Sequence, residues 1–402
     1  MNLSALKSPP FRSYIVSLHL ALNGFWAQRV IIGWLAWDMT GSAGFVGLVA
    51  FLNFFPTLFV SPLFGVFADR IDVRKGSIFS YGIAGTLSAL FACLCIFASP
   101  NPLLLACFSL AAGVISSANH PMRMSLTPRL APAAHLPSVV AVTSLNFNMS
   151  RLTGPAIGGL LIQLIGAPLA FAVTAVTYAA PVIAIYFTRP RERAETNAPP
   201  QSGYLNQLFD GWKYALARPH LRTAIIFGGI GALAGRSILE TLPILANGVF
   251  DRGPSGLGYM TAAAGAGAVG ASIFKAVSKP QKPDEFEPHI LAMPVIIPLL
   301  VASVAMIRDF GTAVAAVGLI GATVTLLAIS LQSTVQMAIE DQYRGRVMGF
   351  WTTISIGSGA LGAVLMGVLV DLAGASTAQL ATGLTLATTS LLILLRFRRH
   401  TG

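Results

Sequence analysis

The chain has 402 residues, of which 54% are hydrophobic and only 10% are charged, and its formal net charge is +11. So few charged side chains cannot cover the apolar surface of a soluble protein, which excludes a soluble enzyme or a soluble nucleic-acid-binding domain. The three cysteines have no His, Asp or Glu at ligand spacing, so no metal site is expected.

Long apolar runs with few charges predict the secondary structure. Each run is close to the roughly 20 residues that a helix needs to cross a bilayer, and it is longer than a strand of a membrane barrel. Because a backbone in lipid must satisfy its own hydrogen bonds, the runs are expected to be helices. Twelve spans are predicted, over residues 14–37, 44–67, 77–98, 102–127, 138–163, 168–188, 222–248, 255–277, 288–307, 311–338, 346–371 and 376–395.

Positive charge is distributed unequally between the two sides of these spans. Twenty Lys and Arg residues lie in the segments on the side of the N-terminus, and only Arg252 and Arg308 lie in the opposite loops. Cytoplasmic segments carry such an excess, so both termini are expected in the cytoplasm. The net charge therefore reflects topology and contact with lipid headgroups, and no nucleic-acid partner is expected.

The first half places basic and polar residues inside the predicted spans. Arg29, Arg123 and Arg151 lie within predicted spans, where a charge is costly and should face a cavity or a specific partner. A cavity lined by them would favour anionic substrates. The alternative is that Arg29 and Arg151 bind backbone carbonyls where helices cross. Asn146 suits a hydrogen bond to a ligand or to another helix.

Two motifs stand out in the first half. Gly65, Asp69, Arg70, Arg74 and Lys75 form the pattern G-x-x-x-D-R-x-x-x-R-K at the hairpin after the second span. A carboxylate there can accept hydrogen bonds from a helix N-terminus and pair with arginine. The alternative is a charge cluster that only sets topology. Asp72 in the same loop either extends this cluster or caps the third span.

The second motif lies in the fifth span. It contains Arg151, Gly154, Pro155, Gly158 and Gly159 in the stretch Ser150–Gly159. Glycine allows helices to approach closely, and proline loosens the backbone hydrogen bonds. Ordinary packing of small residues would produce much of the same pattern.

The longest polar stretch, 189–201, separates six spans from six. The predicted organisation is an N-terminal six-helix bundle over 1–188, a cytoplasmic linker over 189–221 and a C-terminal six-helix bundle over 222–402. Residues 204–217 predict an amphipathic helix on the membrane surface, or an ordinary linker helix. Gly154, Gly159 and Gly166 recur 208 positions later as Gly362, Gly367 and Gly374, which indicates an internal repeat.

The second half offers candidates for proton binding and substrate contact. Arg236 and Glu240 are one helical turn apart and can pair, and Glu240 is the first candidate for a coupling proton. His19 and His120 also lie within spans, where a histidine can titrate near neutrality or simply pack. Gln332 and Gln336 add polar side chains to the tenth span.

These motifs resemble those of the major facilitator superfamily. The hairpin motif resembles the loop between its second and third helices, with Asp72 in place of a glycine, and the fifth span resembles its antiporter signature, with Ser150 in place of the first glycine. Trp26–Arg29, Pro121–Leu130 and Glu340–Gly349 are similar to its enterobactin-exporter-like, or transmembrane secretion effector, group. The resemblance implies a conformational latch at the hairpin and a bacterial inner-membrane exporter.

The expected function is proton-coupled export of a small amphiphilic molecule, such as a siderophore or drug, by alternating access. Uptake by symport and lysolipid flipping are the alternatives within the fold, and a membrane sensor or scaffold is the alternative outside it. No Walker-type nucleotide loop occurs, so neither ATP nor another cofactor is expected. The expected partners are the substrate, protons and membrane lipids, and a monomer is expected.

Overall fold

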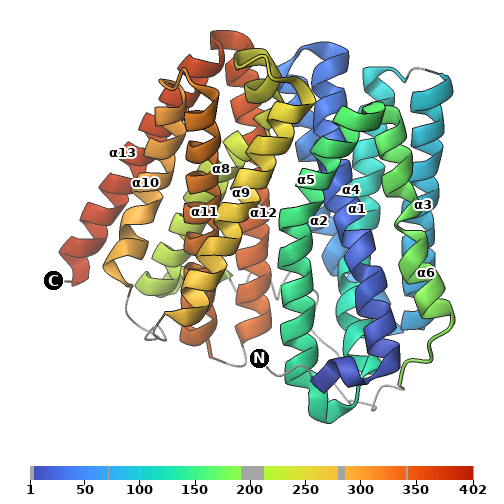
Figure 1. The fold of residues 1–402 in the computed structure, drawn as a ribbon. Helices are drawn as coiled ribbons and strands as arrows, with labels where there is room; N and C mark the ends of the chain where they lie inside the picture. The colour runs from blue at the N-terminus through green and yellow to red at the C-terminus, as the bar shows by residue number, and fades with distance from the viewer. Residues whose placement is uncertain are drawn as a thin grey trace. The chain divides into compact units, whose positions relative to one another are not determined.

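The computed structural model of the chain describes residues 4–70, 72–98, 100–191, 212–278, 286–340 and 343–401. Within these ranges the side chains of a few residues, among them Gly65, Asp69, Arg70 and Asn148, are not described. The regular elements of the described part are helical (Figure 1). This confirms the prediction of an all-α polytopic fold.

Long helices account for most of the described residues. They are α1 (Pro9–Thr40), α2 (Ala43–Arg70), α3 (Val73–Phe97), α4 (Pro102–Leu126), α5 (Leu136–Val176), α6 (Ala179–Tyr186), α8 (Pro219–Leu239), α9 (Gly253–Val277), α10 (Pro288–Val304), α11 (Phe310–Ala338), α12 (Arg344–Ala373) and α13 (Ala375–Thr401). Short 3₁₀ turns cover Ser4–Lys7, Thr127–Leu130 and Ala133–His135, and a π-helical turn covers Ile244–Val249.

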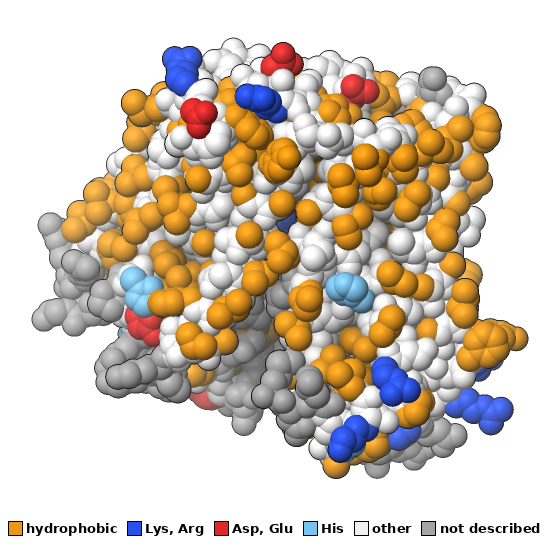
Figure 2. All heavy atoms as spheres, viewed as in Figure 1, with side chains coloured by type: hydrophobic (Ala, Val, Ile, Leu, Met, Phe, Trp, Pro, Cys, Tyr) orange, Lys and Arg blue, Asp and Glu red, His pale blue; other side chains and the backbone are white. Residues whose placement is uncertain are grey.

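Ten apolar helical stretches in the described part are long enough to cross a membrane. One of them, Ala133–Tyr186, has 54 residues and contains both α5 and α6, and the shorter α10 is apolar as well. In Figure 2 hydrophobic side chains cover the middle of the visible face, and most charged side chains lie toward the helix ends. The molecule is therefore a multi-pass membrane protein, and the exact number of twelve spans stays a prediction.

The chain forms two compact units. The first unit comprises Met1–Gly41, Leu52–Asn197 and Gly253–Tyr259. The second unit comprises Ser42–Phe51, Ala198–Arg252 and Met260–Gly402. The first turns of α2 thus belong to the second unit, and the first turns of α9 belong to the first. The domain boundaries drawn from the sequence did not anticipate this exchange of helix ends, and they stay predictions.

Side chains at helix starts satisfy the backbone N–H groups that have no partner within the helix. Asn101 accepts a hydrogen bond from the Leu104 N–H at 2.9 Å at the start of α4. Asp309 accepts bonds from the Thr312 N–H at 2.7 Å and the Thr312 hydroxyl at 3.0 Å at the start of α11. These bonds hold the pKa of the Asp309 carboxyl below its usual value.

Two glycines at equivalent repeat positions have the same backbone conformation. Gly166 has φ 77° and ψ 160° inside α5, and Gly374 has φ 79° and ψ 157° between α12 and α13. The equivalent pair Gly154 and Gly362 each lie against the backbone of another helix: Gly154 against Asn23 of α1, and Gly362 against Leu233 of α8. The internal repeat predicted from glycine spacing is confirmed by these matching geometries.

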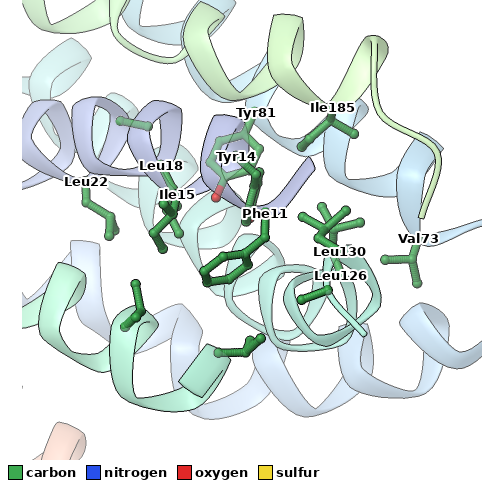
Figure 3. Close-up of a cluster of buried hydrophobic side chains, with 14 of the residues drawn as sticks. Phe11, Tyr14, Ile15, Leu18, Leu22, Val73, Tyr81, Leu126, Leu130 and Ile185 are labelled. Carbon is green, nitrogen blue, oxygen red and sulfur yellow. The ribbon is translucent and has the colours of Figure 1, made fainter. Parts of the chain in front are cut away.

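A hydrophobic cluster holds one end of the first unit together. Phe11 and Tyr14 of α1 are fully buried, as is Leu126 of α4, and Tyr81 of α3 packs beside them (Figure 3). Burying side chains of this size is worth roughly 1.5–3 kcal/mol each when they leave water. The cluster fixes the N-terminal half of α1 against α3, α4, α5 and α6.

Helix α8 is shorter than the span predicted over 222–248. It ends at Leu239, and the chain continues through a turn into the π-helical residues Ile244–Val249. Pro243 explains the difference, because it has no N–H to bond the carbonyl of Leu239 four residues earlier. The sequence prediction of one continuous helix here was wrong.

Candidate functional site

The motif of the fifth span lies where α5 crosses α1, and the two helices run side by side in the first unit (Figure 1). A Cβ atom at Gly154 would lie 2.9 Å from the Asn23 carbonyl oxygen, and one at Gly158 would lie 2.8 Å from the Ala27 carbonyl oxygen. Gly159 lies instead against Gly258 of α9. Pro155 sits between these contacts, inside α5. The motif glycines therefore allow direct backbone contact on two sides of α5.

Polar side chains of α1 and α5 form a network at this crossing. His19 Nδ1 lies 2.7 Å from Asn146 Oδ1 and 3.0 Å from Ser150 Oγ. Asn23 Nδ2 lies 3.1 Å from His19 Nε2, and the Thr153 hydroxyl donates to Asn23 Oδ1 at 2.6 Å. Asn146 and Ser150 are buried, and His19 is half-buried. Of this network, the sequence indicates Asn146 as a candidate for substrate contact and His19 as one for proton binding.

Arg29 and Arg123 lie on aromatic rings. The Arg29 guanidinium is 4.0 Å from the centre of the Phe54 ring and 5.2 Å from that of Trp26. The Arg123 guanidinium is 5.4 Å from the centre of the Phe147 ring, and Phe147 packs edge-on against Trp26 at 5.9 Å. Each cation is attracted by the electron-rich ring face. The structure thus joins two predicted site residues through a continuous row of aromatic rings, here called the arginine–aromatic row.

Arg236 and Glu240 form the ion pair predicted for the second half. Arg236 Nη1 lies 3.2 Å from Glu240 Oε1, and the side chains are 26% and 19% exposed. The Arg236 side chain lies against Gly359 of α12 in the same unit. The pair is confirmed, and its role in transport stays a prediction. Gln332 and Gln336 are both exposed on α11, and Arg151 is half-buried on α5.

The hairpin motif is described only in part. Gly65, Asp69 and Arg70 end α2, and their side chains lie outside the described residues. Asp72 caps α3, because its carboxylate accepts hydrogen bonds from the Arg74 N–H at 2.8 Å and the Lys75 N–H at 3.3 Å. Arg74 Nε donates to the Ile185 carbonyl at 3.2 Å, and its Nη2 donates to the Tyr186 carbonyl. Arg74 thus holds the C-terminal end of α6.

Substituting Asp72 distinguishes a cap from a latch. Asp72→Ala is expected to lower the free energy of unfolding by about 1 kcal/mol, because two N–H groups lose their acceptor. Asp72→Asn keeps an acceptor and should stay close to the wild type. Thermal unfolding of the purified protein and transport assays measure both variants. If Asn impairs transport as strongly as Ala without loss of stability, the charge of Asp72 serves the latch.

Asp371 is a polar residue that the sequence analysis did not single out. It lies near the end of α12, and its carboxylate accepts hydrogen bonds from the Ser42 hydroxyl at 2.6 Å, the Ala43 N–H at 2.7 Å and the Gly44 N–H at 2.8 Å. These groups start α2 within the second unit. A helix N-terminus carries partial positive charge and attracts a carboxylate. The only sequence signal was an acid at the outer end of a span.

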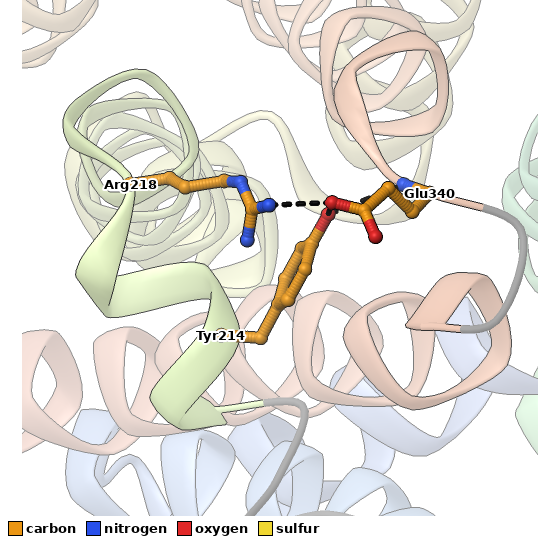
Figure 4. A network of polar contacts seen from close by, with 3 residues as sticks. All are labelled: Tyr214, Arg218 and Glu340. Atoms are coloured by element: carbon orange, nitrogen blue, oxygen red, sulfur yellow. Dashed lines mark hydrogen bonds and ion pairs between the residues drawn. The ribbon is translucent and has the colours of Figure 1, made fainter.

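The described end of the linker packs against the start of α12. Residues 212–217 are helical, and residues 204–211 of the predicted amphipathic helix lie outside the described residues. Arg218 Nη2 pairs with Glu340 Oε1 at 2.6 Å, and the Tyr214 hydroxyl donates to the same carboxylate at 3.3 Å (Figure 4). Trp212 stacks on Phe350 with ring centres 5.7 Å apart. These contacts tie the segment to the second unit.

Long apolar helices in two compact units, with paired charges and polar networks inside the spans, define a polytopic transporter fold. A bacterial homolog of the human lysosomal transporter Spinster, solved in an inward-facing and unoccupied conformation, has this fold: the TM-score is 0.77 at 14% identity, with 97% of each chain covered. The sequence profile of the transmembrane secretion effector family matches residues 1–401. The chain belongs to this family of major facilitator transporters, as its motifs predicted.

Two of the relatives of this chain are an efflux pump and an exporter. The multidrug efflux pump Tap of Mycobacterium tuberculosis is 26% identical over 96% of this chain and 92% of its own length. The enterobactin exporter EntS of Shigella boydii is 26% identical over 98% of this chain and 94% of its own length. The protein is therefore a transporter of small molecules and not an enzyme.

Proposed function

We propose that the protein is a proton-coupled exporter of a small amphiphilic anion with an aromatic part, working by alternating access. The observation that carries the proposed cargo is the arginine–aromatic row of Arg29, Trp26, Phe147 and Arg123. Ring faces bind the apolar part of such a molecule, and a guanidinium binds a carboxylate or phenolate. Residues 9–37 of α1 and the whole of α4 and α5 contain no Asp or Glu.

Export is the proposed direction. The relatives named as an efflux pump and as an exporter support it, and so does the glycine and proline motif that packs α5 on α1. The proposed location is the bacterial inner membrane, with both termini in the cytoplasm, because cytoplasmic segments carry the excess of Lys and Arg. Glu240 remains a candidate for the coupling proton in the second unit.

A flux assay with purified protein in proteoliposomes tests this proposal. We expect inside-out vesicles with an acidic lumen to accumulate an aromatic anion in exchange for protons, and to accumulate its neutral amide analogue less. A lipid analogue tests flipping in the same vesicles. If the aromatic anion accumulates only in right-side-out vesicles, the protein is an uptake transporter and not an exporter. If only the lipid analogue is translocated, the protein is a lipid flippase.

Neutral variants of the two arginines test the proposed cargo. Arg29→Gln and Arg123→Gln are each expected to raise the KM for the anion about fivefold, since a partly desolvated cation contact is worth about 1 kcal/mol. Transport of the neutral analogue should change less than about twofold. Arg308→Gln, in a predicted outer loop, is the matched control. Equal losses for anion and neutral analogue would show that the arginines only support the fold.

A further inference from the structure

We propose that His19 is the site that binds the coupling proton, and that Asn23 transmits its protonation state to α5. The inference rests on the proposed proton-coupled export and names the residue that performs it. Its starting observation is that both ring nitrogens of a half-buried histidine contact side chains that also bridge α1 and α5.

The partners of the ring define its neutral tautomer. Asn146 Oδ1 is an acceptor, and it faces the ring because Asn146 Nδ2 donates to the Ile15 carbonyl at 3.4 Å. His19 Nδ1 therefore carries the hydrogen. On the other side, Asn23 Nδ2 is a donor 3.1 Å from His19 Nε2, so Nε2 accepts. The network in this structure fits a neutral ring with its free lone pair on Nε2.

Protonation at Nε2 breaks this arrangement. A proton from one side of the membrane would form a new Nε2–H bond and leave the ring with one positive charge. Two donors, Nε2–H and Asn23 Nδ2–H, would then face each other. Asn23 must withdraw or rotate its amide to present Oδ1 to the ring. Rotation also ends the bond from Nδ2 to the His19 carbonyl, now 2.8 Å long, so the two states have different hydrogen bonds.

The change at Asn23 reaches α5 directly. Asn23 Oδ1 accepts a hydrogen bond from the Thr153 hydroxyl, and Asn23 Nδ2 lies 3.3 Å from Ser150 Oγ. After rotation Nδ2 would face Thr153, whose hydroxyl can keep its proton on the Met149 carbonyl at 2.9 Å and accept instead. Gly154 packs against the backbone of Asn23 at the same level. Proton binding thus alters the contact on which the two helices cross.

The elements packed on α1, which are α4, α5, α6 and the neighbouring 3₁₀ turns, contain no Asp or Glu that could act as a counter-ion to His19. Their titratable and charged residues include Lys7, His120, Arg123, Arg129, Arg151, Tyr178 and Tyr186, and α1 itself adds Arg12, Tyr14, Arg29 and Asp38. The ring nitrogens contact the neutral amides of Asn146 and Asn23 and the hydroxyl of Ser150. Glu240, by contrast, already has a cationic partner in Arg236.

Two modes of transport separate the role of His19 in coupling from a role in folding. His19→Gln cannot bind a proton at this site but keeps hydrogen-bonding capacity. We expect it to retain substrate counterflow, which needs no net proton movement, within about twofold, and to lose at least about 90% of accumulation driven by a pH gradient. His135→Gln, outside the long helices, should retain both. If His19→Gln still accumulates substrate when driven by a pH gradient, the proposal is overturned. The result would be most direct if Glu240→Gln lost this gradient-driven accumulation.

A second measurement does not depend on transport. Histidine ¹⁵N resonances of the full-length protein in lipid, assigned through sequential backbone correlations in the wild type, report protonation of Nε2. We expect the His19 Nε2 resonance to change over the pH range of the gradient that drives transport, and the Asn23 side-chain amide to shift with the same midpoint. A ring that stays in one protonation state, or an Asn23 amide that does not follow it, contradicts the inference even if His19→Gln fails to fold. Wild-type vesicles without proton-driven flux would instead contradict the proposed function.

Discussion

Gly158→Ala is expected to lower transport at least about tenfold and the free energy of unfolding by about 1–3 kcal/mol, as overpacking of a close contact does. The added methyl would lie 2.8 Å from the Ala27 carbonyl oxygen and 2.9 Å from the Ala27 Cα. Both are backbone atoms, so no side-chain rotation can make room. Helices α1 and α5 would have to separate, and the polar network around Asn23 would separate with them. Thermal unfolding and the vesicle flux assay measure the two effects.

Gly82→Ala is the matched control for this prediction. Gly82 is also a helical glycine, on α3, but a Cβ atom there would meet nothing within 4 Å. The same substitution should therefore be neutral or slightly stabilising, because alanine favours a helix by about 0.8–1 kcal/mol over glycine. Equal transport and equal stability of Gly158→Ala and Gly82→Ala would mean that α1 and α5 can move apart without loss of function. The motif would then serve only general packing.

Asp371→Ala is expected to destabilise the start of α2 by about 1–2 kcal/mol. The Ser42 hydroxyl and the N–H groups of Ala43 and Gly44 would lose the carboxylate that accepts their hydrogen bonds. The backbone amides of Ala43 and Gly44 should exchange their hydrogens at least about fivefold faster, since local opening becomes easier. Hydrogen exchange followed by mass spectrometry of the α2 peptide measures this. Asp371→Asn keeps one acceptor oxygen and should have an intermediate effect.

Asp309→Ala provides the comparison. Asp309 caps α11 through the Thr312 N–H within its own helix, whereas Asp371 caps α2 from α12. Loss of the Asp309 carboxylate should speed amide hydrogen exchange at the start of α11 and leave the exchange rate of the Ala43 amide unchanged. Unchanged exchange at Ala43 in Asp371→Ala would show that Ser42 alone secures the start of α2, through its own contact with the Phe45 N–H at 3.1 Å.

Local signals in the sequence predicted much of the fold. Apolar length predicted the spans, and the glycine spacing predicted the repeat that Gly166 and Gly374 confirm in their dihedral angles. The pairing of Arg236 with Glu240 followed from their separation by one helical turn. These features depend on residues close in sequence or on backbone requirements that only one residue type meets.

Contacts between distant segments were not predictable in the same way. His19 and Asn146 are 127 positions apart, and neither residue type alone indicates the other. The aromatic partners of Arg29 and Arg123 come partly from other helices, so the alternative of carbonyl contacts stayed open until the rings were seen. Asp371 resembled an ordinary charge at a span end, because its partners are 327 to 329 positions earlier.

At Gly166 and Gly374 the chirality of the residue, and not the size of its side chain, restricts which residue can be accommodated. There is room for a methyl group at both: a Cβ atom would meet only Pro168 Cδ, at 3.9 Å, at Gly166, and nothing within 4 Å at Gly374. Their positive φ with extended ψ is closed to L-residues but is the mirror image of an allowed extended conformation. D-alanine introduced by semisynthesis would fit where L-alanine is strained, so the achiral residue is required at both turns by stereochemistry alone.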